Sequence, residues 1–167
     1  MFHGGGHLSV PEPSETYQGL RRMVLDLKAE QFSGHVGEHP VYAALVDMNM
    51  RGGCASIACV VDGTAGLYTS PGGGLIGAGQ RYESVRSAAL AFLDGSAQVL
   101  NRLTLAKDFS LPSGGKHHVY LLSKEGIFKD ELDPDAVSSC SKETQFLFYL
   151  YQNVITALRE NAEDRFP

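Results

Sequence analysis

The chain has 167 residues, which is enough for one domain with its own hydrophobic core, and 43% of them are hydrophobic against 20% charged. Its formal net charge of -5 argues against a general nucleic-acid binder, because neutralising phosphates requires clustered Lys and Arg. The sequence has no run of about 18 or more apolar residues, so a membrane span is excluded.

The N-terminus and the cysteines bear on the compartment. Residues 1–13 are rich in Gly, Pro and His and lack the basic and apolar regions of a secretory signal. We therefore expect a flexible tail over 1–13, followed by a single domain over 14–167. The three cysteines are an odd number, which favours free thiols in a reducing cytoplasm over a disulfide framework.

The first predicted element is an amphipathic helix that begins at Ser14. The apolar residues that recur at three- and four-residue spacing, and so form its buried stripe, are Tyr17, Leu20, Met23, Val24 and Leu27. Charged residues fall between them. The stretch 33–40 contains Gly and Pro, which interrupt a helix, and we expect the helix to end there.

Three strands are predicted next. Val41–Met48 and Cys54–Val61 are apolar on both alternating faces, which is typical of central strands covered on both sides. Asp62 and Gly63 favour a hairpin turn, because a type I′ turn needs two residues that tolerate positive φ. The returning strand is Thr64–Thr69.

A glycine-rich connection over 70–80 is the candidate ligand-binding element. Its spacing matches G-x-G-x-x-G, in which glycines let a pyrophosphate approach the backbone at a helix start. The candidate contacts with an anion or nucleotide are Gly72, Gly73, Gly74, Gly77, Gly79 and Arg81. However, no βαβ unit closes around the motif, and Asp94 falls inside the next helix where a ribose-binding acid would end a strand. A plain loop that ends a strand is the alternative.

The second helix is predicted from about Arg81 to Leu103, where apolar residues recur with a period of 3.6. Gly95 interrupts this helix, which indicates a kink or a close contact with another helix. A second hairpin follows, with strands at Val119–Leu122 and Ile127–Phe128.

The last helix is predicted from about Lys142 to Asn161, after a helix start at Asp133 and Pro134. Its first half is apolar nearly all round, which indicates either burial on more than one side or contact with a partner subunit. The candidate interface residues are Phe146, Phe148, Tyr149 and Tyr151. Burial of these side chains inside a monomer is the alternative.

The order helix, strands, helix, strands, helix predicts an α+β fold, with a single antiparallel sheet of about five to six strands and three helices packed on its faces. Segments 58–73, 86–92 and 119–128 resemble the first hairpin and loop, the middle helix and the later hairpin of roadblock-type domains, which are profilin-like regulatory domains. The match covers roughly residues 14–160, and Val41–Met48 is an additional strand before the matching hairpin. The resemblance implies a dimerising regulatory or scaffold module with no catalytic residues.

The histidines do not form a recognisable metal site. His35 and His39 lie four residues apart, but the Gly and Pro around them disfavour the helix that would align them. His117 and His118 are consecutive on a predicted strand, so their side chains point to opposite faces. We predict no metal site.

The cysteines offer one candidate nucleophile. Cys54 and Cys59 diverge on a predicted strand, and Cys59 lies in an apolar run where a thiol is usually inert. Cys140, just before the last helix, is the better candidate for a reactive thiol, with an ordinary loop cysteine as the alternative. No catalytic residue is assigned.

The sequence therefore predicts a non-enzymatic regulatory or scaffold module that interacts with proteins, as a homodimer or with another protein partner. No cofactor, nucleic acid or membrane is expected. The alternative is a small ligand-binding sensor or enzyme that uses the loop 72–79 to hold an anion or nucleotide.

Overall fold

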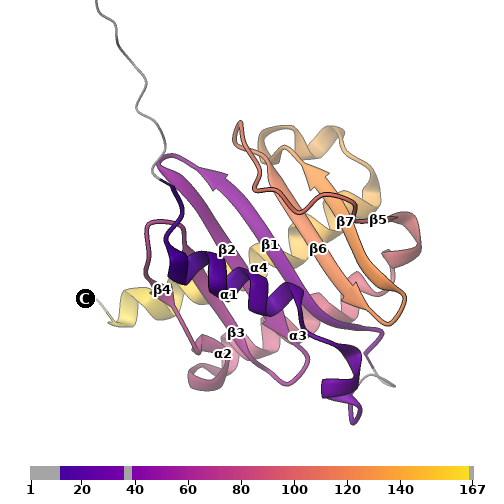
Figure 1. Cartoon of the computed structure of the whole chain (residues 1–167), viewed down its shortest axis with the longest axis horizontal. Helices are drawn as coiled ribbons and strands as arrows, with labels where there is room; N and C mark the ends of the chain where they lie inside the picture. Colours follow the sequence, from indigo (N-terminus) through magenta and orange to yellow (C-terminus); the bar gives the residue numbers. More distant parts are fainter. Residues whose placement is uncertain (1–11, 36–38, 166–167) are drawn as a thin grey trace, which may run out of the picture.

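The structure, a computed structural model, describes residues 12–35 and 39–165. The predicted tail over 1–13 lies almost entirely outside this range. The strands are β1 (Val41–Met50), β2 (Gly53–Val60), β3 (Ala65–Thr69), β4 (Gly74–Leu75), β5 (Thr104–Leu105), β6 (His117–Ser123) and β7 (Gly126–Leu132). They form one antiparallel sheet in the order β4-β3-β2-β1-β6-β7-β5 (Figure 1).

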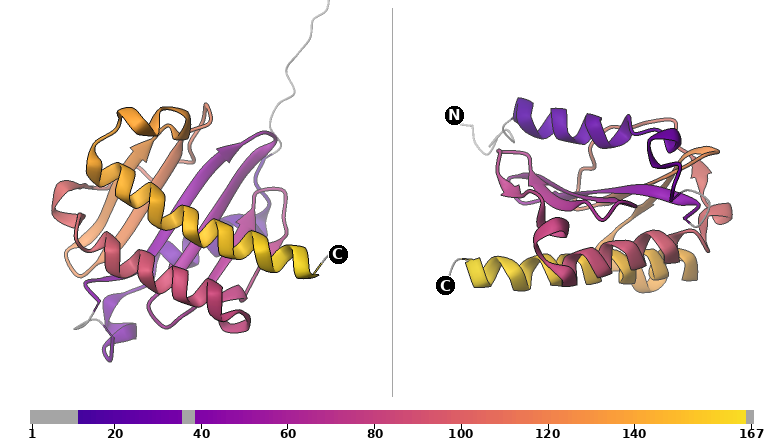
Figure 2. Two further views of the ribbon diagram at one scale, coloured as in Figure 1. Left: turned by 180° about the vertical axis from the view of Figure 1, so that it is seen from behind. Right: turned by 90° about the horizontal axis from the view of Figure 1, so that it is seen from below.

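Helices cover both faces of this sheet. The α-helices are α1 (Glu15–Leu25), α2 (Ala78–Arg81), α3 (Glu83–Ser96) and α4 (Lys142–Arg165), and the 3₁₀ helices are η1 (Ala29–Phe32), η2 (Leu100–Arg102) and η3 (Pro134–Ser139). Figure 2 shows α1 on one face and α3 and α4 side by side on the other. The predicted α+β fold with a single antiparallel sheet is confirmed.

The predicted numbers of strands and helices are wrong. The sheet has seven strands because the two-residue strands β4 and β5 pair at its edges, and two residues are too few to show an alternating pattern. The single helix predicted from Arg81 to Leu103 is divided, because the backbone of Tyr82 is extended between α2 and α3. It also ends early, at Ser96, and only a 3₁₀ turn follows.

Helix α1 begins where the sequence predicts. The Ser14 side chain accepts a hydrogen bond from the Tyr17 backbone N–H, which caps the helix. Tyr17 and Val24 are buried against the sheet, but Met23 is 63% exposed. The predicted buried stripe is therefore too broad at Met23, which lies on the outer side of the helix.

The core lies on both sides of the three central strands. Every residue of β2 and β6 is buried, as is β1 from Val41 to Met48, so the two predicted central strands are confirmed. On the face of the sheet opposite α1, helices α3 and α4 approach each other closely at Gly95, where an added Cβ would lie 2.6 Å from Leu150 Cδ1. Of the two outcomes predicted for Gly95, the structure shows the close helix contact. Across the described residues, no helix combines the length and the apolar character that crossing a bilayer requires.

Candidate functional site

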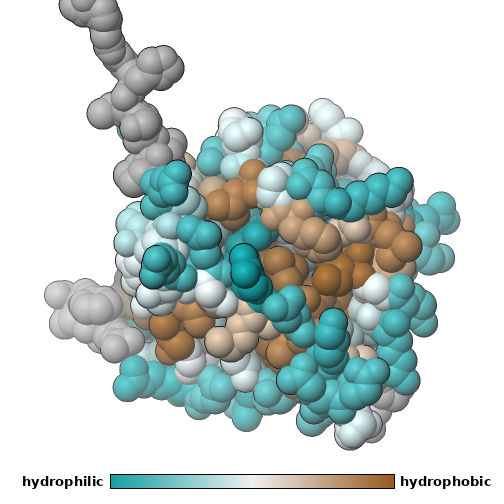
Figure 3. All heavy atoms as spheres, viewed as in Figure 1, coloured by the Kyte–Doolittle hydropathy of each residue, from teal (hydrophilic) through white to brown (hydrophobic). Residues whose placement is uncertain are grey.

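A groove of about 1050 Å³ opens on the α1 face of the sheet. One wall is α1, which contributes Arg22 and Leu25, and the other is the loop 106–116 between β5 and β6, which contributes Phe109 and Leu111. Figure 3, which views this face, shows hydrophobic surface directly beside hydrophilic surface. The groove thus combines apolar walls with charged groups at its rim.

A second cavity of about 230 Å³ continues this groove toward the β6–β7 turn. The two cavities share Leu25, Lys28 and Ile127 in their linings. At its far end the second cavity is lined by Tyr42 and Lys124. The two sections are therefore contiguous, and Ile127 lies where they join.

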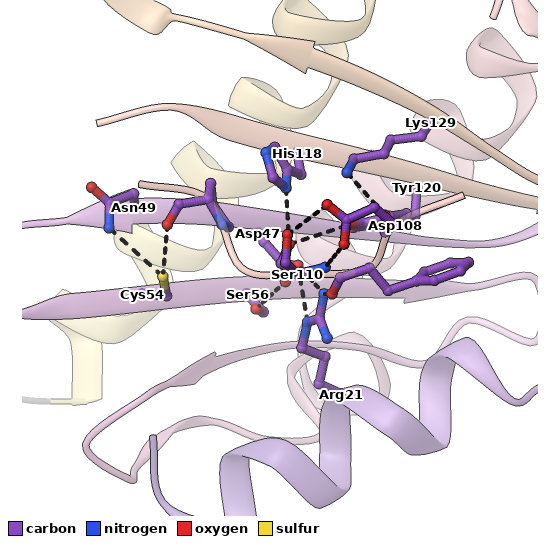
Figure 4. A network of polar contacts seen from close by, with 12 residues as sticks. Arg21, Asp47, Asn49, Cys54, Ser56, Asp108, Ser110, His118, Tyr120 and Lys129 are labelled. Atoms are coloured by element: carbon purple, nitrogen blue, oxygen red, sulfur yellow. Dashed lines mark hydrogen bonds and ion pairs between the residues drawn. The ribbon is translucent and has the colours of Figure 1, made fainter. Parts of the chain in front are cut away.

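Beneath the groove, a buried carboxylate links α1 to the sheet (Figure 4). Asp47 of β1 is fully buried, and its Oδ2 lies 2.8 Å from Nη2 of Arg21, which comes from α1. Ser56 of β2 donates a hydrogen bond of 2.6 Å to Oδ1 of Asp47. Since the Ser56 hydrogen is used there, the Tyr17 hydroxyl, at 2.6 Å, donates to Ser56. The charge of Asp47 is thus both paired and hydrogen-bonded, as burial requires.

Side chains from α1, β6 and β7 hold the loop wall against the sheet. Arg21 donates to the Phe109 carbonyl, and Lys129 of β7 donates to the Asp108 carbonyl over 2.9 Å. His118 of β6 has Nδ1 at 3.1 Å from the Ser110 carbonyl, and this nitrogen carries the hydrogen because a carbonyl can only accept. Hydrogen bonds from these three side chains to backbone carbonyls of the loop therefore hold this wall in place.

One aromatic ring organises the charges at this wall. The ring of Tyr120 stacks on Phe109, with centroids 5.5 Å apart. It also lies 5.8 Å from the guanidinium of Arg21 and 5.3 Å from the ammonium of Lys129, within the range of cation–π attraction. Arg21 and Lys129 are thus engaged by the ring and by loop carbonyls. Chemically, the network can orient the loop, while the groove above it offers apolar surface and rim charges for binding.

Sequence reasoning missed this network, although the sequence contained a signal. Asp47 is the only charged residue in the apolar strand Val41–Met48, and a charge in a strand covered on both faces must have a buried partner. Its partner Arg21 could not be chosen from the sequence, because many other cations were available.

The glycine-rich connection lies at the β4 edge of the sheet. None of the six candidate ligand-binding residues lines the groove. Those with positive φ are Gly72, Gly73, Gly74 and Gly77. A Cβ at Gly74 would lie 2.0 Å from the Leu67 carbonyl, and one at Gly79 would lie 2.2 Å from the Gly63 carbonyl. Glycine is needed at these two positions because another backbone segment packs against each of them, and this need explains both glycines without a ligand. Arg81 is exposed at the end of α2, and binding of an anion there stays a prediction.

The four candidate interface residues on α4 have different surroundings. Tyr151 is fully buried, and its hydroxyl lies 2.7 Å from Nδ1 of His117. Phe148 is half-buried and stacks on His117, and Phe146 is half-buried beside α3. Tyr149 alone among the four is exposed, at 61%. Burial in the monomer thus accounts for Tyr151, and Tyr149 faces away from the sheet.

The two consecutive histidines of β6 lie on opposite faces of the sheet. His117 faces α4 and His118 faces the loop, so the prediction that they point to opposite faces is confirmed. Burial lowers the pKa of His117 to about 4. Within the described ranges, no three His, Cys, Asp or Glu side chains are grouped so that they could hold a metal ion.

The three thiols also differ in their surroundings. Cys54 lines the groove but is 8% exposed, and burial raises its pKa. Cys59 is fully buried on the opposite face, and burial raises its pKa to about 12. Cys140 is half-buried just before α4, with its Sγ 3.7 Å from the Ala136 carbonyl. Cys140 is thus the most accessible of the three.

Comparison of the chain with protein-family models, with curated proteins and with solved structures finds no match.

Proposed function

We propose that the protein is a cytoplasmic regulatory or scaffold module, rather than an enzyme, that works as a homodimer and binds a segment of a partner protein in the groove beside α1. The size of the groove and its continuation into a second section carry this proposal. Its main section of about 1050 Å³ already matches the upper end of small-molecule pockets, roughly 300–1,000 Å³, and the second section extends it further. An extended or helical peptide fits two contiguous sections better than a compact ligand does.

The walls of the groove also suit a polypeptide. Apolar side chains line its centre, among them Leu25, Leu111 and Ile127, while charges such as Arg22 and Lys28 lie at its rim. This arrangement of an apolar centre and a polar rim is typical of protein interfaces. Because the loop wall is already hydrogen-bonded to the sheet, less conformational entropy is lost on binding.

Three further points support the proposal. The resemblance of the hairpins and middle helix to roadblock-type domains implies a dimerising regulatory or scaffold module. The titratable groups under the groove, Asp47 and His118, are engaged by Arg21 and by the loop, so they serve the fold. The three free cysteines suit a reducing cytoplasm.

A random peptide library displayed on phage tests the groove. We expect enriched peptides whose synthetic versions bind the wild-type protein with micromolar Kd. Ile127→Lys, at the junction of the two sections, should weaken binding at least about tenfold, because it buries a charge against the peptide. Ile76→Lys is the matched control, since Ile76 is 63% exposed and lies outside the groove. Failure to enrich any peptide, or equal loss in both variants, would overturn the proposal.

A further inference from the structure

The chain enters the described part of the structure at the groove itself. Glu12 and Pro13, the first two described residues, both line its main section. The backbone is fixed there, because the N–H of Ser14 donates a hydrogen bond of 2.7 Å to the carbonyl of Ser70. The eleven residues 1–11 are therefore joined to the chain at the groove wall.

We infer that residues 7–11 of this chain fold back along α1, bind in the groove and cover it until a partner segment displaces them. Tyr17, Arg21 and Leu25 line the groove on successive turns of α1, so the groove follows this helix for about 12 Å. An extended chain covers that distance in about four residues, and residues 1–11 can span about 36 Å. The segment is therefore long enough to reach the groove centre from its point of attachment.

The sequence of the segment suits the groove. Val10 and Glu12 each precede a proline, which favours an extended backbone at both positions. Every second side chain of an extended chain points to the same side, so Leu8 and Val10 share a side with Glu12, which lines the groove. Residues 1–11 contain no Asp, Glu, Lys or Arg, so their entry buries no charged side chain. The segment thus offers two apolar side chains to the apolar centre of the groove.

The covalent connection determines how strongly the segment covers the groove. A short flexible connection gives an effective concentration in the millimolar range, so a segment of weak intrinsic affinity, with a Kd of about 1 mM, still occupies the groove most of the time. A partner segment binds only the uncovered fraction, and its affinity is lowered by that factor, about three- to fivefold. This regulatory role rests on the proposed function of the groove, whereas the docking of the segment does not.

Amide ¹H–¹⁵N NMR spectra of the full chain test the docking. The double variant Leu8→Ser with Val10→Ser should shift the resonances of the groove walls and leave those of α3 and α4 unchanged, which also shows that the variant is folded. The matched control is His7→Ser with Ser9→Ala, because these side chains point to the other side of an extended segment. The control should leave the resonances of the groove walls in place.

Groove resonances that do not respond to the Leu8 and Val10 substitutions, or that respond equally to the control, overturn the inference. A response that disappears on dilution from about 200 to 20 µM also overturns it, because binding within one chain does not depend on concentration.

The regulatory role has its own measurement. Peptides selected on the groove should bind the Leu8 and Val10 double variant about three- to fivefold more tightly than the wild type, and equal Kd values would overturn that role. The NMR comparison needs no peptide. Failure of the docking is therefore distinguishable from failure of the proposed function, which shows as a library without enriched peptides.

Discussion

On the α3–α4 side of the sheet the packing is apolar and close: Gly95 lets Leu150 approach, and Tyr151 fills the space under α4. On the α1 side, by contrast, the helix and the loop are joined to the sheet by a buried ion pair and by hydrogen bonds from Arg21 and Lys129 to loop carbonyls. The α1 side is thus held mainly by a polar network and the α3–α4 side mainly by apolar packing, to which the His117–Tyr151 and Thr144–Asp130 hydrogen bonds add two polar links to α4.

This difference bears on what each side can do. Apolar packing is non-directional, and it leaves the outer surface of α3 and α4 free to vary without disturbing the sheet. The polar network instead fixes the position of one loop, because each hydrogen bond has a required geometry. A groove wall that must be preformed is better built by such directional hydrogen bonds than by apolar packing alone.

The largest effect is expected from breaking the buried pair. Asp47→Ala leaves the Arg21 guanidinium, only 14% exposed, without its carboxylate, and should lower the free energy of unfolding by about 3–5 kcal/mol. Urea unfolding followed by circular dichroism measures the loss. The double variant Arg21→Met with Asp47→Leu removes both charges and should recover most of it. If the double variant is as unstable as Asp47→Ala, the pair is not what joins α1 to the sheet.

A smaller and pH-dependent effect is expected on the apolar side, at His117. Its pKa in the folded protein is about 4, below the usual 6.5, because burial under α4 disfavours the charged form more than the nearby carboxylate of Asp133 favours it. Above pH 6.5 both folded and unfolded chains hold a neutral imidazole, so the stability does not change. Between pH 6.5 and about 4 only the unfolded chain binds the proton, and stability falls.

The full shift would correspond to about 3 kcal/mol, and screening by solvent at the edge of the site reduces the expected loss to about 2 kcal/mol. Urea unfolding at pH 7.5 and pH 4.5, repeated with His117→Gln, measures this contribution, since Gln keeps a polar group for Tyr151 but does not titrate. Equal losses in the wild type and the variant would show that His117 is not the group responsible.

Two helical glycines give opposite expectations for the same substitution. Gly19→Ala on α1 adds a Cβ with no atom within 4 Å, so it should stabilise the protein by about 0.5–1 kcal/mol through helix propensity. Gly95→Ala on α3 adds a Cβ 2.6 Å from Leu150 and 3.3 Å from Phe146. This overpacking should outweigh the same gain in helix propensity and leave the protein less stable by about 1–2 kcal/mol. Thermal unfolding of the two variants checks the signs. Stabilisation by both would mean that α3 and α4 are not closely packed.

The sequence predicted the apolar side of the molecule better than the polar side, for a physical reason. Hydrophobic periodicity reports which residues are buried, so β1 and β2 follow from it. The glycine inside a predicted helix indicated a kink or a close helix contact at Gly95, and the close contact is what the structure has. The partners of a buried polar group come from distant parts of the chain, as Arg21 does for Asp47, and no local pattern records such a pairing. The groove was therefore not predicted. The sequence also could not show that Tyr149 of α4 is exposed whereas Tyr151 is buried.

The smallest effect concerns the three thiols, which report on the two sides separately. In the native protein we expect one fast reaction with a thiol reagent such as DTNB, at the half-buried Cys140, and Cys140→Ser should abolish it. Cys54 lies under the loop, where its Sγ is 3.8 Å from the Pro112 carbonyl, and should react when the loop opens. Cys59 is buried among central strands and should react only on global unfolding.

The distinction between Cys54 and Cys59 can be sharpened by loosening the loop alone. Lys129→Met removes the hydrogen bond to the Asp108 carbonyl while keeping a side chain of similar length over Tyr120. This variant should speed the reaction of Cys54 and leave that of Cys59 unchanged, because local opening on the α1 side exposes only the first thiol. Equal acceleration of both thiols would mean that the two sides open together, and that the loop is not an independently held wall.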